Sequence, residues 1–440
     1  MKRILYLYSF VAALGGFLFG FDMAVISGTI PFITEYFNLS DTLLGYAVSS
    51  ALIGCVIGAL FVGKPGDAFG RRNMLKVMAA LFFISAIGSG IANSLTVFVI
   101  FRFIGGLAVG GASVLSPMYI SEISPAKIRG RMVAITQLAI VIGALAAFFS
   151  NYLLVGLGEN NWRWMFLAEV IPALTFFIML FFVSASPRWL VKMGRIDEAR
   201  SVIKSVNPMA NTEKVIDEIT QSIDKEVFAR SVVLFNKPYL RLVLIGIAVG
   251  MFNQFTGINV VFYYTPTIFK SAGFGNESAL MQTVIIGATN LVFTIIAMSV
   301  IDRLGRKFLL ILGAIGMPVF LGLFAITFLN QDFEGYLVLI YLIGFVAFFA
   351  SSQGVVIWVI LAEMFPNNIR ARASAIGSFS HWFFNALTAF LFPIAIGAFG
   401  IGYIFVFYTI ATISSLFFFI KFLVETKGKT LEALEKVVLK

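Results

Sequence analysis

The sequence contains few charged residues and almost no cysteine or histidine. Only 12% of its 440 residues are Asp, Glu, Lys or Arg, whereas soluble domains carry ~25%. A single cysteine (Cys55) and a single histidine (His381) exclude a disulfide framework and a Cys/His zinc site. By contrast, 60% of the residues are apolar. This composition excludes a soluble globular protein, a disordered chain and a nucleic-acid-binding protein, and it predicts a chain that lies mostly in a lipid bilayer.

Twelve apolar runs are each long enough to cross a membrane. A bilayer core of ~30 Å needs about 20 apolar residues in a helix, and the runs lack the alternation of a membrane barrel. The first run follows Lys2 and Arg3, is too long for a signal peptide and is expected to be retained. The sequence therefore predicts an all-α membrane protein with spans at 6–34, 43–63, 74–93, 96–120, 131–155, 163–184, 239–269, 280–301, 308–329, 336–361, 372–398 and 401–423.

The basic residues predict the orientation of these spans. With the N-terminus in the cytoplasm, only Arg163 and Lys270 fall on the outer side and Arg102 falls within a span. The other 29 of the 32 Lys and Arg then face the cytoplasm, as the positive-inside rule requires. Both termini are therefore expected in the cytoplasm of a plasma-type membrane. The net charge of +10 reflects this topology and predicts contact with anionic inner-leaflet lipid.

Two motifs recur in order, which predicts a duplicated six-helix unit. Asp67-Ala-Phe-Gly-Arg71 follows the second span and Asp302-Arg-Leu-Gly-Arg306 follows the eighth, at an offset of 235 residues. A second pair of motifs, beginning at Glu122 and at Glu363, recurs at an offset of 241. The predicted domains are two halves at 1–184 and 239–423, a cytoplasmic helical linker at 185–238 and a cytoplasmic tail at 424–440. Within the linker, apolar residues at helical spacing predict short amphipathic helices at 196–205 and 213–227, with a solvated linker as the alternative. In transporters built from such repeats, the substrate site lies at the repeat interface.

The charges of these motifs are predicted to form a cytoplasmic gate. Acidic and basic groups at the inner ends of neighbouring spans pair in a partly desolvated setting, and such pairs would latch the two halves together while the cytoplasmic side is closed. Positive-inside topology alone needs only Lys and Arg and does not explain the acidic members. The predicted gate residues are Asp67, Arg71, Arg72, Glu122, Arg129, Asp302, Arg306, Glu363 and Arg370.

Together, the motifs resemble those of the sugar porter family of the major facilitator superfamily. Arg102-Phe-Ile-Gly-Gly, Gln254-Phe-Thr-Gly-Ile-Asn259 and Glu425-Thr-Lys-Gly occur in the family's order and spacing, and the resemblance covers nearly the whole chain. It implies twelve helices, a central sugar site and alternating access in a bacterial inner membrane. We expect a monomer without a cofactor, driven by the proton gradient. One departure is Ala185, where the family usually has Glu.

Two ionisable residues within the spans, Asp22 and Arg102, are predicted to couple transport to protons. Intramembrane charges are costly unless paired and are functional candidates by default. A carboxylate whose Arg partner moves away gains and loses a proton as the protein changes state. In the family, a proton-coupled bacterial xylose carrier has Asp and Arg at the matching positions, whereas uncoupled human glucose carriers have a neutral residue at the position of Asp22. The alternative is a static salt bridge. Glu169, also within a span, is interpreted as structural.

Neutral amides and aromatic rings are the residues that suit a sugar site. Amides donate and accept hydrogen bonds at once, and aromatic rings stack on the C–H faces of a sugar. Resemblance implies sugar contacts by Gln137, Gln254, Asn259, Asn290 and Trp358, with Phe19 and Trp382 lining the cavity. Asn253, Tyr263 and His381 complete the predicted set. The alternatives are interhelical hydrogen bonds for a lone amide and plain packing for the histidine.

Helical spacing supports the sugar set, and departures from the family limit it. Asn259 and Tyr263 share a helix face, and Gln254 is expected on the same broad stripe. Asn253 stands where a Gln is usual, His381 where a Gln or Asn is usual, and Gln353 with Val355 disrupts the usual Gly-Pro pair. These changes leave the sugar unnamed.

The sequence thus predicts a proton-coupled importer of a monosaccharide, either a hexose or a pentose. An uncoupled facilitative carrier is the nearest alternative. A non-transporting sugar sensor is disfavoured because only the short segment 424–440 follows the last span. A membrane-embedded enzyme is disfavoured because the sequence offers no nucleophile–base pair and no metal-ligand set.

Overall fold

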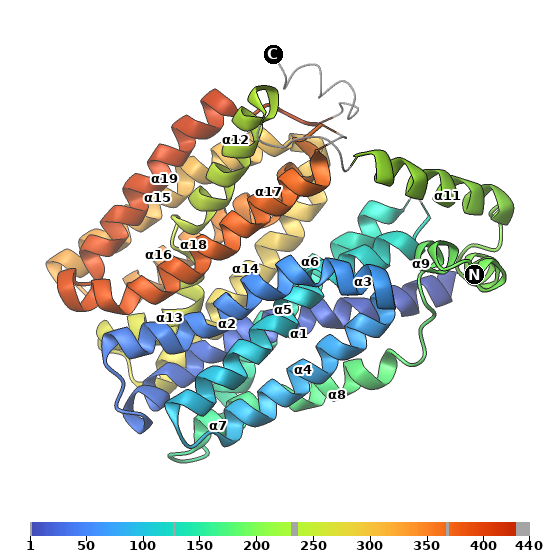
Figure 1. The fold of residues 1–440 in the computed structure, drawn as a ribbon. Coiled ribbons are helices and arrows are strands. Elements are labelled where there is room, and N and C mark those ends of the chain that lie inside the picture. The colour runs from blue at the N-terminus through green and yellow to red at the C-terminus, as the bar shows by residue number, and fades with distance from the viewer. Residues whose placement is uncertain (1, 126–127, 230–235, 367–368, 428–440) are drawn as a thin grey trace. The chain divides into compact units, whose positions relative to one another are not determined.

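The computed structural model describes residues 2–125, 128–229, 236–366 and 369–427, and every regular element within these ranges is a helix (Figure 1). Twelve helical segments are long and apolar enough to cross a membrane. The predicted fold class, an all-α protein with twelve spans, is therefore confirmed.

The observed spans match the predicted apolar runs to within a few residues at each end. The first six are α1 (Lys2–Tyr36), α2 (Asp41–Phe61), α4 (Arg71–Ile91), α5 (Leu95–Ile123), α6 (Arg129–Leu154), and α7 (Asn161–Leu167) with α8 (Val170–Met179). The last six are α12 (Lys237–Gln254) with α13 (Ile258–Ser271), α14 (Asn276–Leu304), α15 (Arg306–Asn330), α16 (Leu337–Ala350) with α17 (Gln353–Glu363), α18 (Arg370–Phe399) and α19 (Ile401–Phe422). A short helix, α3 (Gly63–Phe69), follows α2.

Three of the spans are broken in the middle, which the apolar pattern does not reveal. Between α12 and α13, Gly257 takes a left-handed φ of 82°, a conformation that glycine adopts without strain. Between α16 and α17, Ser352 leaves the helical region, and its hydroxyl donates to the carbonyl oxygen of Phe348 at 2.6 Å. The expectation that Gln254 and Asn259 share one helical stripe is therefore wrong, because the chain turns between them.

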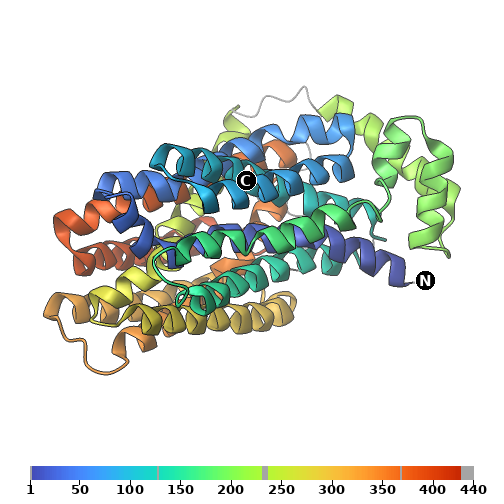
Figure 2. The same cartoon turned by 90° about the horizontal axis from the view of Figure 1, so that it is seen from below.

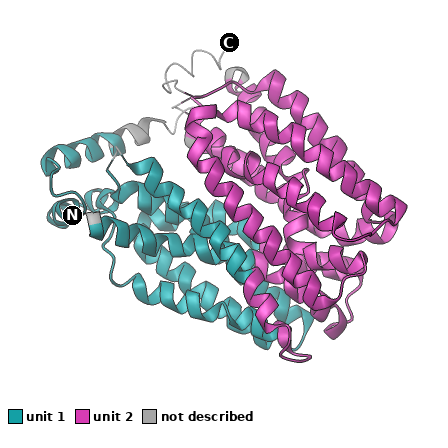
Figure 3. Ribbon diagram, turned by 180° about the vertical axis from the view of Figure 1, so that it is seen from behind, with its two compact units in different colours: residues 1–23, 53–147, 163–232 teal, residues 24–52, 148–162, 233–440 magenta. Residues whose placement is uncertain are grey.

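Contacts divide the chain into two compact units (Figure 3). Unit 1 comprises residues 1–23, 53–147 and 163–232, and unit 2 comprises residues 24–52, 148–162 and 233–440. Within unit 2, Asn151 of α6 donates from Nδ2 to the carbonyl oxygen of Val25 at 3.0 Å. This division by contacts does not follow the boundaries of the sequence repeat, so the predicted halves stay a prediction.

The polar segment after the sixth span folds as three helices of unit 1. They are α9 (Pro187–Lys192), α10 (Ile196–Val206) and α11 (Thr212–Ala229), and the last two confirm the helices expected from the spacing of apolar residues. Their apolar faces form a small core that includes Leu190, Ala199 and Ile203. Figures 1 and 2 show these helices at the same end of unit 1 as the start of α1.

Glycines allow helices of unit 1 to approach at backbone distance. A Cβ atom on Gly20 of α1 would collide with the carbonyl oxygen of Ile140 on α6 and lie 2.8 Å from the nitrogen of Ala144. A Cβ atom on Gly110 of α5 would collide with the backbone of α2. Small residues commonly permit such contacts between membrane helices. The contact with α6 holds α1 in place just before Asp22.

Candidate functional site

A buried ion pair joins α1 to α5. Nη1 of Arg102 lies 2.7 Å from Oδ1 of Asp22, and Nη2 of Arg102 donates to the backbone oxygen of Asp22 at 3.1 Å. Both residues are sealed from solvent, with Asp22 0% and Arg102 1% exposed. Gly105 makes room for the pair, because a Cβ atom there would lie 3.1 Å from Oδ1 of Asp22. The structure thus brings together the two residues predicted to couple transport to protons.

A second carboxyl group, that of Glu169, lies beside this pair at the break between α7 and α8. Glu169 is fully buried and interacts electrostatically with both Asp22 and Arg102. Within the described chain, no N–H or O–H group donates to either oxygen of Glu169 or to Oδ2 of Asp22. The two carboxyl groups are close enough to hydrogen-bond through a proton held between them. Sequence reasoning treated Glu169 as structural; the available signal was its place as another acidic residue within a span.

Five polar side chains of unit 2 form one continuous chain of hydrogen bonds. Asn253 donates from Nδ2 to Oε1 of Gln353 at 3.3 Å and accepts at Oδ1 from Nε2 of Gln254 at 3.0 Å. Gln254 accepts at Oε1 from Asn259 at 2.8 Å. Its Nε2 lies 3.0 Å from Nδ1 and 3.3 Å from Nε2 of His381 on α18. We call these five residues the amide chain; four of them were predicted to bind substrate, and Gln353 was not.

Aromatic side chains flank the amide chain. The ring of His381 lies 4.8 Å from the ring of Trp358 and 5.6 Å from that of Trp382, measured between centroids. The hydroxyl of Tyr263 accepts a hydrogen bond from Nδ2 of Asn385 at 3.2 Å. Sequence reasoning missed Asn385, although it follows His381 by four residues on α18 and so shares its helix face.

Three residues of the predicted sugar site lie outside both the amide chain and the aromatic contacts described above. Asn290 on α14 is half-buried, as are Phe19 on α1 and Gln137 on α6, the last two belonging to unit 1. Within the described residues, Asn290 and Gln137 make no side-chain hydrogen bond. Their amide groups are therefore free to bond to another molecule, and the role of all three stays a prediction.

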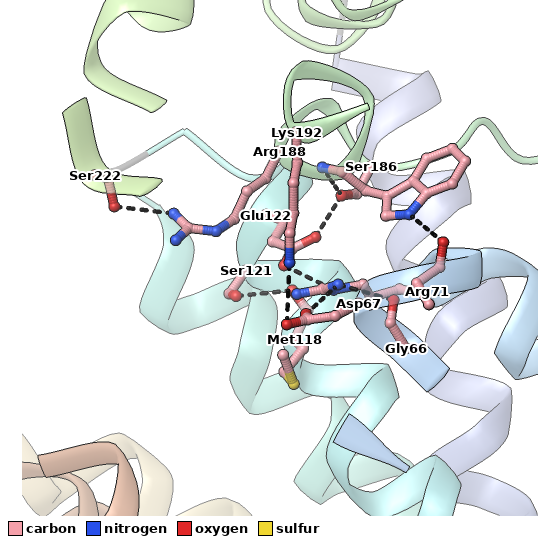
Figure 4. Close-up of polar contacts among 12 residues, drawn as sticks. Gly66, Asp67, Arg71, Met118, Ser121, Glu122, Ser186, Arg188, Lys192 and Ser222 are labelled. Carbon is pink, nitrogen blue, oxygen red and sulfur yellow. Dashed lines mark hydrogen bonds and ion pairs between the residues drawn. The ribbon is translucent and has the colours of Figure 1, made fainter. Parts of the chain in front are cut away.

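A charged cluster joins α3, α4, α5 and α9 in unit 1 (Figure 4). Arg71 lies 2.7 Å from Asp67 and 3.0 Å from Glu122. Lys192 lies 3.2 Å from the other oxygen of Asp67, and the hydroxyl of Ser186 donates to Oε2 of Glu122. Partial burial opposes ionisation of Asp67, but its two cationic neighbours outweigh that effect and lower its pKa. Three predicted gate residues are thus in direct contact.

The same arrangement recurs in unit 2. Arg306 lies 3.0 Å from Asp302 and 3.3 Å from Glu363. The hydroxyl of Thr426 donates to the other oxygen of Glu363 at 2.6 Å, as a serine hydroxyl does in unit 1. Thr426 follows Ser186 by 240 residues, close to the offsets of the two repeated motifs. The duplication therefore extends from the sequence to the side-chain contacts.

These ion pairs each lie within a single unit, where they join neighbouring helices. The predicted latch between the two halves is a different contact and stays a prediction. The remaining gate residues donate to backbone carbonyl oxygens: Arg72 to Val183 at 3.1 Å, Arg129 to Ser124 at 3.5 Å and Arg370 to Phe365 at 3.1 Å.

Comparison with known proteins assigns the family. The family model described as "Sugar (and other) transporter" matches residues 8–438. The chain belongs to this family. It is 40% identical to the D-xylose-proton symporter of Escherichia coli (strain K12), over 97% of this chain and 94% of the relative. It is also 36% identical to the arabinose-proton symporter of Bacillus subtilis (strain 168), over 99% and 95% of the two chains.

Solved structures similar to this sugar transporter have the same fold. An inward open conformation of the xylose transporter XylE from E. coli matches with a TM-score of 0.88 and 38% identity, covering 98% of this chain and 99% of that chain. The major facilitator superfamily proton:xylose symporter XylE bound to 6-bromo-6-deoxy-D-glucose matches with a TM-score of 0.82 and 39% identity, covering 99% of both chains. The fold is therefore that of the major facilitator superfamily, and the chain is a multi-pass membrane protein.

The two units of this sugar transporter differ at one position of the repeat, which is an acidic residue in unit 2 and an alanine in unit 1. Glu425 accepts hydrogen bonds from the backbone N–H groups of Arg306 at 3.0 Å and Lys307 at 2.9 Å, which begin α15. Partial burial opposes ionisation of Glu425, but these and neighbouring N–H groups outweigh that effect and lower its pKa. The position 240 residues earlier is Ala185. The N-cap residue of α4, which begins at Arg71, is Gly70 and has no side chain to cap the first turn.

Proposed function

We propose that this protein is a proton-coupled importer of a hexose or pentose that works by alternating access. We further propose that it works as a monomer in the bacterial inner membrane, with both termini in the cytoplasm and without a cofactor or a catalytic step. The observation that carries the proposal is the buried group of two carboxyls and one guanidinium formed by Asp22, Glu169 and Arg102.

The charges of this group explain why it would hold a proton. If both carboxyls were ionised, one guanidinium would leave one negative charge uncompensated in a site sealed from water. An uncompensated buried charge costs several kcal/mol. One proton shared by Asp22 and Glu169 removes that charge, and both groups present oxygens without a protein donor to receive it.

Proton binding and sugar binding are linked in the proposed cycle. A proton from outside reaches Asp22 and weakens its pairing with Arg102. The sugar then binds, the predicted cytoplasmic latch opens, and both are released inside. At a membrane potential of −100 mV, each inward charge supplies about 2.3 kcal/mol. Since about 1.4 kcal/mol corresponds to a tenfold change in concentration ratio, one proton per sugar supports more than tenfold accumulation.

The substrate class rests on the amide chain and on the relatives. The amides and imidazole offer donors and acceptors suited to sugar hydroxyls, and Trp358 and Trp382 offer faces suited to ring C–H groups. The relatives named above are symporters of xylose and arabinose. These observations support a monosaccharide substrate.

Transport by purified protein in liposomes tests the proposal. Radiolabelled xylose, arabinose, glucose and galactose are offered with and without an imposed pH gradient and voltage. We expect at least one sugar to accumulate only with the gradient. Asp22→Asn and Glu169→Gln are expected to lose accumulation and to keep sugar exchange across the membrane. Glu277→Gln, which alters an exposed carboxyl at the start of α14, is the matched control.

Two outcomes would contradict the proposal in different ways. Equal sugar uptake with and without the gradient would identify an uncoupled facilitative carrier. No uptake or exchange of any sugar by folded protein would contradict sugar transport itself.

A further inference from the structure

Two cations lie next to each other in the first turns of α4. Arg72 and Lys76 are four residues apart, the spacing at which side chains on a helix are neighbours. The charge of Arg72 acts on Lys76. Like charges at this spacing repel each other and destabilise a helix, so an anion between them would be stabilising.

Neither cation has an anionic partner within the described residues. Arg72 donates from Nη1 to the backbone oxygen of Val183 at 3.1 Å, and its buried Nε has no hydrogen-bond partner in this part of the chain. Nζ of Lys76 lies 3.7 Å from the centre of the Phe181 ring. A lysine ammonium has three N–H donors, and a ring face accepts none of them as strongly as an oxygen does. Both side chains therefore keep donors for another molecule.

The repeat shows that the fold does not require a lysine at this position. At the offset of 235 residues, Arg72 corresponds to Lys307 and Lys76 corresponds to Ile311. Lys307 donates from Nζ to the backbone oxygen of Ile420 at 2.8 Å, much as Arg72 donates to a backbone oxygen in unit 1. Ile311 is half-buried like Lys76. The second cation is thus a feature of unit 1 alone.

Exposed aromatic rings border the cation pair. Phe181 is 57% and Phe182 is 72% exposed, and they follow α8, which packs against α4 (Figure 1). In a membrane protein, exposed rings of this kind face the acyl chains of lipids. Basic pockets between membrane helices on the cytoplasmic side bind anionic lipid headgroups. Cations beside lipid-facing rings therefore suit a molecule that has both a phosphate and acyl chains.

We propose that Arg72, Lys76, Phe181 and Phe182 form a binding site for an anionic phospholipid, which we call the lipid site. The phosphate accepts hydrogen bonds from Lys76 and Arg72, and an acyl chain lies against the two rings. A zwitterionic lipid binds more weakly, because its own ammonium group offsets the charge of its phosphate. The proposal rests on the orientation proposed above, which places this end of α4 at the cytoplasmic leaflet.

Native mass spectrometry of detergent-purified protein measures the binding. Phosphatidylglycerol and phosphatidylethanolamine with the same acyl chains are titrated separately. We expect phosphatidylglycerol to bind more tightly. Lys76→Gln is expected to weaken the binding of phosphatidylglycerol about fivefold and to change that of phosphatidylethanolamine by less than about twofold. Lys76→Arg keeps the charge and is expected to bind phosphatidylglycerol within about twofold of the unaltered protein.

A matched control and a photoreactive lipid assign the effect to this site. Lys270 is an exposed lysine in the last turn of α13, with Pro266 and Phe274 four residues to either side. Lys270→Gln removes a cation that has no such cationic neighbour and is expected to leave the binding unchanged. Phosphatidylglycerol with a diazirine on an acyl chain is expected to cross-link to the peptide that contains Phe181, and to do so less in Lys76→Gln.

Three results would overturn the inference. They are equal binding of the two lipids, unchanged binding and cross-linking in Lys76→Gln, and complete displacement of phosphatidylglycerol by millimolar inorganic phosphate. The last result would identify a site for a free anion, because a soluble phosphate lacks the acyl chains that the rings contact. Failure of sugar transport would contradict the proposed function and would leave these lipid measurements unaffected.

Discussion

Replacing Glu425 with alanine tests whether a single carboxylate anchors the start of α15. Glu425 accepts from the backbone N–H groups of Arg306 at 3.0 Å, Lys307 at 2.9 Å and Lys427 at 2.9 Å. Loss of a helix cap costs about 0.5–2 kcal/mol, and a hydrogen bond to a charged group contributes about 1.5–3 kcal/mol when shielded. Because Glu425 is half-exposed, we expect Glu425→Ala to lower the free energy of unfolding by about 1–2 kcal/mol.

Denaturant unfolding of detergent-purified protein, followed by circular dichroism, measures this change. Glu334→Ala, which removes an exposed carboxylate in the loop before α16, is the control and is expected to be within about 0.5 kcal/mol of the unaltered protein. The folded pKa of Glu425 is lowered, so its stabilising effect is present above the unfolded pKa of about 4.3 and is lost as pH falls through the folded pKa. The difference between Glu425→Ala and the unaltered protein should therefore shrink below about pH 4.

The reciprocal change adds a carboxylate to unit 1 at Ala185, the position that corresponds to Glu425. Ala185→Glu places a carboxylate where the repeat has Glu425, to cap the first turn of α4, whose N-cap residue Gly70 has no side chain. A new cap there is expected to raise the free energy of unfolding by about 1 kcal/mol. The reasoning is refuted if Glu425→Ala is as stable as the unaltered protein at neutral pH, or if its deficit grows at acidic pH.

Two further substitutions test packing and pairing in unit 1. Gly20→Val is expected to destabilise the protein by about 2 kcal/mol or more, because its Cβ atom would collide with the carbonyl oxygen of Ile140; the yield of monodisperse protein on size exclusion measures this. Gly156→Ala, with nothing within 4 Å of an added Cβ atom, should match the unaltered yield, and a normal yield for Gly20→Val would contradict the close approach. Arg71→Gln removes the cation that bonds directly to Glu122, whose side chain is 8% exposed, and is expected to cost about 3 kcal/mol in denaturant unfolding. Adding Glu122→Gln should recover part of that loss, whereas simple additivity of the two changes would show that the ion pair contributes nothing.

The twelve spans and the duplicated motifs could be predicted from the amino-acid sequence alone. Crossing a bilayer requires about 20 apolar residues per helix, so the spans appear as uninterrupted apolar runs. The amphipathic helices α10 and α11 were found in the same way from the spacing of their apolar residues. Asp22 and Arg102 stood out because charges within spans are rare. Each of these inferences depends only on residue type and on distance along the chain.

The breaks in three spans and the partners of the buried polar groups were decided by the tertiary structure. Gln254 meets Asn259 across a turn that an apolar run does not reveal, and Glu169, which immediately precedes α8, meets Asp22 where α8 packs with α4 in unit 1. The acceptor that Gln353 offers to Asn253 comes from a residue 100 positions away. Apolar burial depends on composition and has no direction, whereas a hydrogen bond needs a donor and an acceptor at one distance and one angle. Only the folded chain brings such atoms together.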